Sequence, residues 1–463
     1  MVGGFMKINE NDVDKAISSL TSAYMAKTKR SRELFEYAQR VLPGGATYHI
    51  RYFSPYPLYM SKAKGSKIWD VDGNEYDDYW MGHGAHILGH APDFVVEAVN
   101  EVSRSGTHLG FENEYAVRYA ELLTRVIPNA EMVRFCNSGT EANMYAVRLA
   151  RAYTKRRYIV KIEGGWHGSL DQLHVALTPP FHGAESLGIL EEFIKYTIAV
   201  PYNDLDKLEN TLRNFDVAAI LIEPVPGSGG CIEPEPNYLK EVRRLADAYG
   251  ALLIFDEVIT GFRLALGGAQ EYFNVKADLV VLGKIVGGGY PGAGAFAGPS
   301  EYMELLNHLK YPNPRQRVFH GGTFTGNTIS MVAGYTTIKY LYENRHLYDE
   351  FNYRWSSTAK KLDEVCQEFN RICWITSVGS MIGIHFTSSK PRNIAEAYMN
   401  RLSEKIYKAL HMYMIVNGIV YMTANMPHLM PSIVHTEEQA KRLVATFTQF
   451  LSYITNYVKM STS

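Results

Sequence analysis

The stretch ALLIFDEVITGFR, residues 251–263, contains a short apolar run that ends in two acidic residues, Asp256 and Glu257. A second stretch, DLVVLGKIVGGG at residues 278–289, also begins with a short apolar run, and Lys284 follows that run. Short apolar segments that alternate with helical stretches are typical of parallel strands covered by helices on both faces. These two stretches therefore predict strands of a mainly parallel α/β sheet, with a carboxylate and a lysine at the strand ends.

Three further apolar runs continue this pattern, and each is followed by a polar or glycine-rich segment. The runs are residues 132–135, 158–162 and 218–222. They are followed by Asn137-Ser138-Gly139-Thr140, by Gly164-Gly165-Trp166-His167-Gly168 and by Glu223-Pro224. Ligands of open parallel sheets bind beyond the carboxyl ends of the strands. We therefore expect a ligand site at this edge, built from a helix N-terminus, an aromatic ring, two acids and a lysine.

Each of these residues has a commoner explanation when it is considered alone. A Ser-Gly-Thr sequence is usually a helix N-cap, Trp166 could fill the core, Asp256 could end a turn, and Lys284 could be a solvated loop charge. Together they match the needs of pyridoxal phosphate (PLP), which are a lysine for a Schiff base, a carboxylate at the pyridine nitrogen, a phosphate cradle and a flat stacking partner. Lys284 and Asp256 are the predicted catalytic residues.

The chain resembles the class III, fold type I, PLP-dependent aminotransferases, and among them the branch that contains the glutamate-1-semialdehyde 2,1-aminomutases. The similarity runs in one order through nearly the whole chain. The segments that carry it are Pro43-Gly44-Gly45 with Arg51, Trp69–Gly73, Asn137–Asn143, Ile222–Gly230, Ala251–Arg263, Asp278–Gly289, Gly321–Asn327 and His435–Glu438. The resemblance implies a large domain with a mainly parallel sheet covered by helices, together with a smaller α+β domain.

The resemblance also implies roles for single residues. Lys284 would form the Schiff base, and Asp256 would pair with the pyridine nitrogen. Val258 and Trp166 would lie on opposite faces of the cofactor ring, although Tyr is commoner than Trp at the latter position. The other implied contacts are Ser138, Gly139 and Thr140 at the phosphate, Glu223 near the phenolic oxygen, and Thr323 at the phosphate of a neighbouring subunit's cofactor. A homodimer is therefore expected.

Substrate recognition is implied for Arg51, whose guanidinium suits two-point contact with a carboxylate. Three features depart from the aminomutase pattern. His83 stands where those enzymes usually carry Trp, and the Glu that they carry near Pro427–His428 is absent. A second substrate-binding arginine, which some relatives place near Met426, is also absent. These departures leave the reaction of this chain open.

The segment YFSPYPL, residues 52–58, is similar to the aromatic β-amino-acid aminotransferases of the same branch. Nearby residues favour an apolar or aromatic substrate side chain: Tyr48, His49, Tyr52, Met422 and Met426. We interpret the chain as an aminotransferase that moves an amino group between an amino acid and an oxo acid. Glutamate-1-semialdehyde aminomutase and an amino-acid racemase or epimerase are the alternatives. A PLP-binding regulator is disfavoured because the first residues form no basic DNA-binding unit.

The domain organisation is expected to follow the change in pattern along the chain. We expect an N-terminal helix and strand segment over residues 1–90 that packs with the small domain, a PLP-binding domain over 91–335 and a C-terminal α+β domain over 336–463. Helices are predicted at 12–41, 348–370 and 393–416, and strands at 375–386. Asp72-Gly73-Asn74 predicts a hairpin turn between two short strands.

Composition excludes several other classes of protein. Of 463 residues, 47 are Lys or Arg and 48 are Asp or Glu, so the net charge of −1 argues against nucleic acid or an anionic membrane as the main partner. Four cysteines without a CxxC pair predict neither a disulfide framework nor a zinc ribbon, and the default location is cytoplasmic. His83, His86 and His90 lack an acid or thiol to complete a metal site, so no metal is expected.

Overall fold

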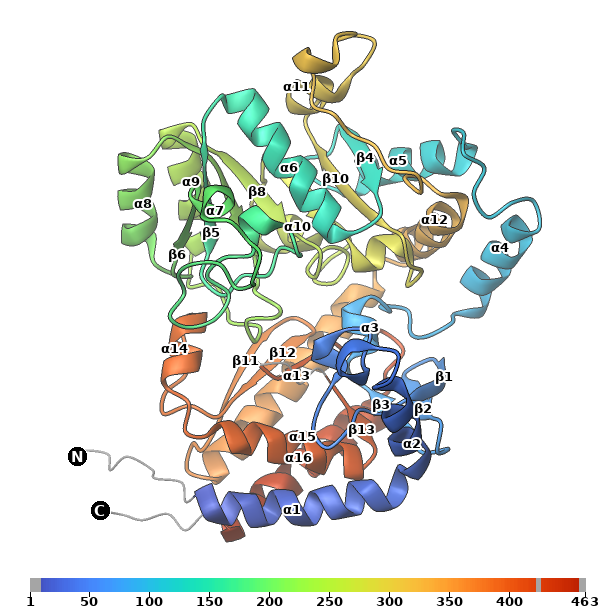
Figure 1. Ribbon diagram of the computed structural model, residues 1–463, viewed down its shortest axis with the longest axis vertical. Coiled ribbons are helices and arrows are strands. Elements are labelled where there is room, and N and C mark those ends of the chain that lie inside the picture. Colours follow the sequence, from blue (N-terminus) through green and yellow to red (C-terminus); the bar gives the residue numbers. More distant parts are fainter. Residues whose placement is uncertain (1–9, 422–425, 458–463) are drawn as a thin grey trace.

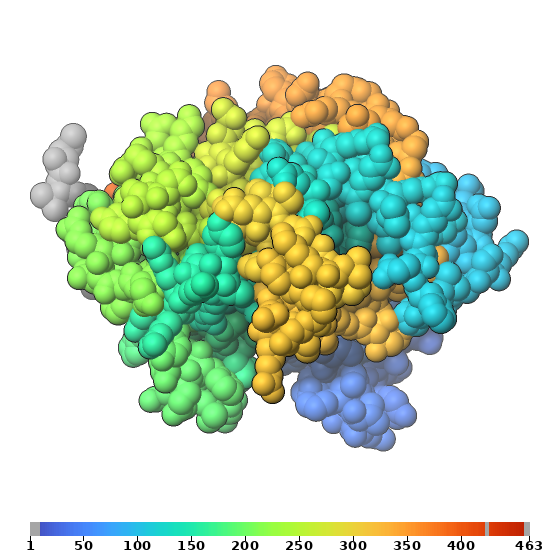
Figure 2. All heavy atoms as spheres, turned by 90° about the horizontal axis from the view of Figure 1, so that it is seen from above, coloured from blue at the N-terminus to red at the C-terminus, as the bar shows by residue number. Residues whose placement is uncertain are grey.

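The computed structural model describes residues 10–421 and 426–457, and Met422 lies outside them. Figure 1 shows two packed parts. The upper part carries the large sheet and its helices, and the lower part combines the N-terminal and C-terminal segments of the chain. Seen from above in Figure 2, the gold segment around residues 300–320 lies between green parts of the chain on the left and cyan parts on the right.

The large sheet has seven strands in the order β4-β10-β9-β8-β7-β5-β6. Their bounds are β4 Met132–Cys136, β5 Tyr158–Ile162, β6 Thr197–Val200, β7 Val217–Ile222, β8 Leu252–Asp256, β9 Leu279–Leu282 and β10 Gly294–Gly298. The five strands from β9 to β6 pair in parallel, and β10 runs antiparallel to both β9 and β4. The prediction of a mainly parallel sheet is confirmed, although β6 and β10 were not predicted.

Both faces of this sheet are buried, which explains the continuous apolar runs in the sequence. Along β7, Ile220 packs in the core beneath α8 and α9, whereas Leu221 packs in the core beneath α6. In β8, Phe255 packs in the same core as Ile220, and Ile254 packs in the same core as Leu221. Side chains that alternate between two helix layers must all be apolar. The helices of this part are α4 Asp93–Ser103, α5 Glu114–Val126, α6 Gly139–Thr154, α7 Glu191–Ile194, α8 Leu205–Asn214, α9 Tyr238–Tyr249, α10 Gly268–Phe273, α11 Ser300–Met303 and α12 Thr328–Glu343.

The lower part contains two smaller sheets. Strands β1 Met60–Lys64, β2 Lys67–Asp70 and β3 Glu75–Asp78 form an antiparallel meander, and β13 Ile419–Val420 pairs in parallel with β3. The second sheet contains β11 Trp374–Val378, β12 Met381–His385 and β14 His428–Leu429. The hairpin turn is confirmed because Asp70 accepts hydrogen bonds from the backbone N–H groups of Asp72 and Asn74. The sheet of β1, β2, β3 and β13 thus contains strands from both ends of the chain.

The helices of the lower part are α1 Glu10–Lys27, α2 Lys29–Ala38, α3 Met81–Gly84, α13 Leu347–Glu368, α14 Ile394–Met399, α15 Glu404–Val416 and α16 Glu437–Tyr457. Figure 1 shows α1 running below α15 and α16, with which it is in contact. The single helix predicted at 12–41 is interrupted at Thr28, whose backbone is not helical. The helix predicted at 393–416 is also broken, because Ser403 is extended and its hydroxyl caps α15 at Lys405. No helix in the described ranges is long and apolar enough to cross a membrane.

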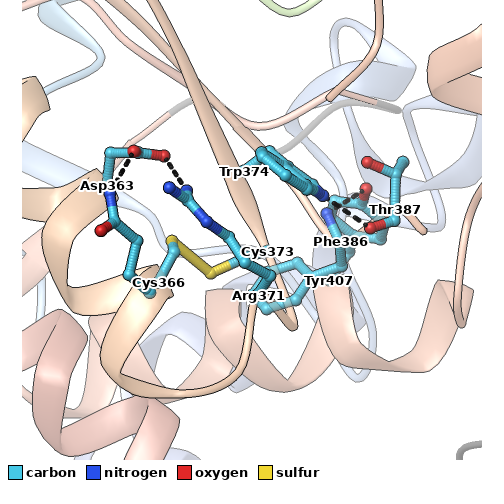
Figure 3. The surroundings of a disulfide bond; sticks show 9 residues. Asp363, Cys366, Arg371, Cys373, Trp374, Phe386, Thr387 and Tyr407 are labelled. Atoms are coloured by element: carbon cyan, nitrogen blue, oxygen red, sulfur yellow. Dashed lines mark hydrogen bonds and ion pairs between the residues drawn. A yellow bond between two sulfur atoms is a disulfide. The ribbon is translucent and has the colours of Figure 1, made fainter. Parts of the chain in front are cut away.

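Cys366 and Cys373 form a disulfide, a bond that was not predicted, because no disulfide framework was expected from the sequence. After α13 the chain turns back through Asn370 and Arg371, both in the left-handed region, and the two cysteine Cα atoms lie 5.5 Å apart. Figure 3 shows the bond beside the ion pair between Arg371 and Asp363, whose atoms are 2.7 Å apart. The spacing of the cysteines alone does not reveal this reversal of the chain.

Replacing Leu443 by Ala should destabilise the lower part of the molecule. Leu443 lies in α16, is fully buried, and packs in the core that α1 and α15 share. A Leu→Ala change in such a core costs about 2–5 kcal/mol through lost burial and a residual cavity. Urea unfolding followed by far-ultraviolet circular dichroism measures this loss, and an unchanged midpoint would contradict the burial of Leu443 in this core.

Candidate active site

A cavity of about 500 Å³ lies at the carboxyl edge of the large sheet. Five strands contribute to its wall through the residues at or just after their ends. These residues are Ser138 after β4, Trp166 after β5, Glu223 after β7, Asp256 in β8 and Lys284 after β9. Segments far apart in the sequence therefore meet in the wall of one cavity, as expected for a parallel α/β sheet.

The closeness of Asp256 and Lys284 follows from the pairing of their strands. Strands β8 and β9 are parallel neighbours in which Asp256 faces Val281, and Lys284 comes three residues later. Lys284 has a left-handed φ of 50° directly after β9. A side-chain-bearing residue rarely adopts this conformation, and such residues cluster at functional sites.

Asp256 accepts hydrogen bonds from three groups. Its Oδ2 contacts Asn143 Nδ2 at 2.8 Å and His167 Nδ1 at 2.7 Å, and its Oδ1 accepts from the N–H of Val258 at 3.1 Å. Burial lowers the pKa of His167, while the hydrogen bond to Asp256 acts in the opposite direction. A neutral His167 donates from Nδ1 to the carboxylate. These three donors hold the orientation of the Asp256 carboxylate.

Two other ionisable groups in the cavity are shifted by burial. Burial lowers the pKa of Lys284, and the nearby carboxylates of Asp256 and Glu223 partly oppose this. Burial raises the pKa of Glu223 to about 7, and the charge of Asp256 acts in the same direction. Glu223 accepts hydrogen bonds from the N–H groups of Trp166 at 2.9 Å and Gly227 at 3.1 Å. Perturbed acids and bases in one cavity are a common mark of an active site.

The N-terminus of α6 forms the part of the cavity that suits an anion. The Ser138 hydroxyl caps this helix by accepting from the N–H of Glu141 at 3.2 Å, so the N-cap interpretation is also correct. The N–H groups of Gly139 and Thr140 have no acceptor within the described residues. A Cβ at Gly139 would lie 2.7 Å from Val258 Cγ2, so only glycine allows this close approach. Free amides at a helix start bind phosphate groups well.

The predicted site residues meet in this cavity with one exception. Arg51, Gly139, Thr140 and Val258 line it together with the five strand-end residues. Thr323 does not line it and is exposed on the surface of this chain. The roles of all these residues in holding a cofactor or substrate stay predictions.

Sequence reasoning missed several wall residues. Asn143 lies four residues after Gly139 on α6, and His167 follows Trp166 directly, yet both contact Asp256. The spacing of four residues on a helix could have revealed Asn143, because residues four apart share a helix face. The segment 290–293 also lines the cavity and carries no recognisable motif.

One expectation about neighbouring residues needs correction. Tyr48, His49, Tyr52 and Met426 do not line this cavity. Among the described residues, no group of three or more His, Cys, Asp or Glu side chains is arranged to hold a metal ion. His90 instead contacts the buried Asp78, with Nε2 and Oδ2 2.6 Å apart.

The donor set of the cavity fits PLP. Lys284 supplies an amine, Asp256 a carboxylate, the start of α6 free amides for a phosphate, and Trp166 and Val258 apolar surface in the cavity wall. Glycine at 139 lets the start of α6 approach Val258 closely, since a Cβ there would lie 2.7 Å from Val258 Cγ2. Fold and site together define a PLP-dependent enzyme of fold type I.

Comparison with known proteins identifies the family. A family model for class III aminotransferases matches residues 51–451, and the chain belongs to this family. It is 40% identical over 428 residues to a glutamate-1-semialdehyde 2,1-aminomutase from Archaeoglobus fulgidus, covering 92% of this chain and 100% of that protein. An ω-transaminase structure from Sphaerobacter thermophilus has a TM-score of 0.84 at 33% identity, covering 91% and 97%. A β-phenylalanine aminotransferase from Variovorax paradoxus has a TM-score of 0.86 at 28% identity, covering 97% and 100%.

Replacing Glu223 by Gln should change how stability depends on pH in the PLP-free protein. The pKa of Glu223 is about 7 when folded, against an ordinary value of 4.5, so the folded protein binds the proton more tightly. The wild type should therefore lose stability relative to Glu223→Gln as pH rises from about 4.5 to 7, by roughly 3 kcal/mol.

Urea unfolding of both proteins across this pH range measures the difference. Glu257, which has a similarly raised pKa, is present in both proteins and cancels. A difference that stays constant with pH would show that the Glu223 carboxyl is not held in a buried, proton-binding state.

Proposed function

We propose that this chain transfers amino groups on PLP bound in the 500 Å³ cavity, with Lys284 as the lysine that carries the cofactor. The juxtaposition of Lys284 and Asp256 beside the open start of α6 supports this proposal most strongly. Bound PLP supplies an electron-accepting ring that makes the substrate's Cα–H bond acidic. Asp256, held by Asn143 and His167, keeps a proton at the pyridine nitrogen.

Lys284 has a second role in this proposal as the group that moves protons. Its pKa is lowered by burial, so the neutral amine is more accessible near pH 7 than for an exposed lysine. Trp166 and Val258 hold the ring between them. Glu223 is placed toward the phenolic oxygen, and Ser138, Gly139 and Thr140 hold the phosphate. Arg51 binds the substrate carboxylate at the mouth of the cavity.

A homodimer is part of the proposal. Thr323 is exposed and lies outside the cavity of its own chain, as a residue must be if it reaches a neighbouring subunit's cofactor. The adjacent Phe324 is 56% exposed, and an apolar ring at this position is consistent with burial against a second copy.

The names of the curated relatives favour glutamate-1-semialdehyde aminomutase as the reaction. The aminomutase from Archaeoglobus fulgidus is 40% identical over nearly the whole chain, and one from Methanothermobacter thermautotrophicus is 43% identical over 374 residues. In this reaction one molecule is both amino donor and acceptor, so a single carboxylate contact at Arg51 suffices to orient it. We therefore place this reaction first.

A second cavity favours an intermolecular aminotransferase instead. It has a volume of about 300 Å³ and shares Arg51 and Gly82 with the catalytic cavity. Most of its wall is apolar and comes from Phe53, Leu58, Ile68, Trp80, Ile415 and Val420. Burial lowers the pKa of His83 in this wall to about 3, so the ring is neutral at pH 7. An apolar or aromatic side chain of an amino donor fits this space.

Replacing Lys284 by Ala should abolish turnover and the visible absorption of the covalently held cofactor, because no other amine is placed at the same point of the cavity wall. The matched control is Lys240→Ala, an exposed lysine of α9. Absorbance spectra and amino-transfer assays of both variants check this. A fully active Lys284→Ala protein would refute the proposed chemistry.

Activity assays with a panel of substrates, on the wild type and on the cavity-filling variant Leu58→Trp, distinguish the two reactions. Aminomutase activity predicts that glutamate-1-semialdehyde is converted to 5-aminolevulinate without an added amino donor. Aminotransferase activity predicts that amino acids with large apolar side chains convert PLP to its amino form and release oxo acids. If the chain is an aminotransferase, Leu58→Trp, which narrows the apolar cavity, should lower kcat/KM for those large donors by about 10- to 100-fold. The kcat/KM for alanine as donor should stay unchanged.

The outcome of that panel decides between the two candidates. Conversion of glutamate-1-semialdehyde that is unaffected by Leu58→Trp assigns the aminomutase. Selective loss of the large donors in Leu58→Trp assigns the aminotransferase. Exchange of the Cα proton without release of an oxo acid would instead indicate a racemase or epimerase.

A further inference from the structure

Lys161 is a buried cation that the proposed chemistry does not use. It lies in β5, between β7 and the edge strand β6 of the large sheet, and its side chain has no exposed surface. No carboxylate in the described part of the chain lies within ion-pair distance of its amine. A lysine without such a partner is costly to bury, and it persists only where hydrogen bonds satisfy its ammonium group.

Three backbone carbonyls satisfy this ammonium group. The Nζ atom donates to the carbonyl oxygens of Gly165 at 2.9 Å, Val175 at 2.8 Å and Leu173 at 3.3 Å. An ammonium group has three donors, so each one has an acceptor. All three carbonyls belong to the segment that follows β5, residues 163–175, which we call the β5 loop.

The β5 loop carries the residues that face the catalytic cavity from this side. Trp166, His167 and Gly168 line the cavity, and His167 contacts Asp256. Gly168 packs so tightly against the start of α6 that a Cβ there would lie 2.2 Å from Thr140 Oγ1. The loop therefore contacts the acid of β8 and the anion cradle of α6.

The contacts of Lys161 lie at the two ends of this loop. Gly165 directly precedes Trp166, whereas Leu173 and Val175 lie where the loop returns to the sheet. A backbone bond from Gly164 N–H to the Ala176 carbonyl, 2.7 Å long, closes the loop at the same place. One cation thus fixes the distance between the ends, and with it the position of the cavity-lining residues between them.

We propose that Lys161 is a positioning residue of the cofactor site, which holds the β5 loop in the shape that places Trp166 and His167 against PLP. It does not touch the cavity itself. Its removal leaves three interior carbonyls without a donor, and the loop can regain hydrogen bonds only by moving toward water. The covalent attachment at Lys284 is untouched by this change.

The test compares Lys161→Met, which keeps the length of the side chain but has no donor, with Lys161→Gln, which keeps two. Equilibrium dialysis should show PLP binding weakened by about tenfold or more in Lys161→Met and by less in Lys161→Gln. The circular dichroism of the bound cofactor should change in the same order, because it reports the orientation of the ring. Leu443→Ala is the control for general destabilisation, since it lies in α16 and lines neither cavity.

A second readout needs no cofactor. In the PLP-free protein, hydrogen exchange at the Gly164 and Trp166 amides should be faster in Lys161→Met than in Leu443→Ala. The Gly164 amide closes the loop on the Ala176 carbonyl, and the Trp166 amide reaches Glu223 from the closed loop. If Lys161→Met is not recovered folded, Lys161→Gln decides by the same measurements. PLP affinity, dichroism and amide exchange that match those of Leu443→Ala would overturn the proposal and leave Lys161 as a purely structural residue.

Discussion

The parallel pairing of β8 with β9 is the constraint on which the site depends. It places Asp256, the last residue of β8, opposite Val281 of β9. Lys284 comes three residues after Val281, so the acid and the lysine lie at the same edge of the sheet. Parallel strands require crossover connections, and these supply the helices that cover both faces of the sheet. The same arrangement places the start of α6 and the β5 loop at the same edge. A cavity with an acid, an amine and an anion cradle is therefore a consequence of the sheet order.

Burial then adjusts the chemistry of the groups that the sheet assembles. Lys284, Glu223 and His167 all have pKa values shifted toward their neutral forms because the cavity removes them from water. Asp256 differs from these neighbours in its contacts, because it accepts hydrogen bonds from three donors. The site thus combines a carboxylate held by three donors with neighbours whose pKa values are shifted by burial. In the proposed function, the carboxylate held by three donors is the one that pairs with the pyridine nitrogen.

The strands that carry the site were predictable because both of their faces are buried, which leaves continuous apolar runs. Strand β10, GAFAG, was not, since its small residues resemble a loop and its place is set by pairing with β4 and β9. His167 and Asn143 act through Asp256, and that contact exists only after folding. The Cys366–Cys373 bond depends on a left-handed reversal that spacing does not reveal. The apolar second cavity unites segments from both ends of the chain, so no local pattern predicts it.

Lys284 is the lysine that we expect to carry the cofactor, to the exclusion of every other lysine in the chain. Lys161 is the strongest competing candidate for the cofactor lysine, because it also lies near the carboxyl edge of the sheet and burial lowers its pKa to about 7. Borohydride reduction of the purified protein with PLP fixes the cofactor to its lysine, and peptide mapping then locates it. Labelling of the peptide that contains Lys284 is the predicted result. Labelling at Lys161, or at no single lysine, would contradict the assignment of Lys284 as the cofactor lysine.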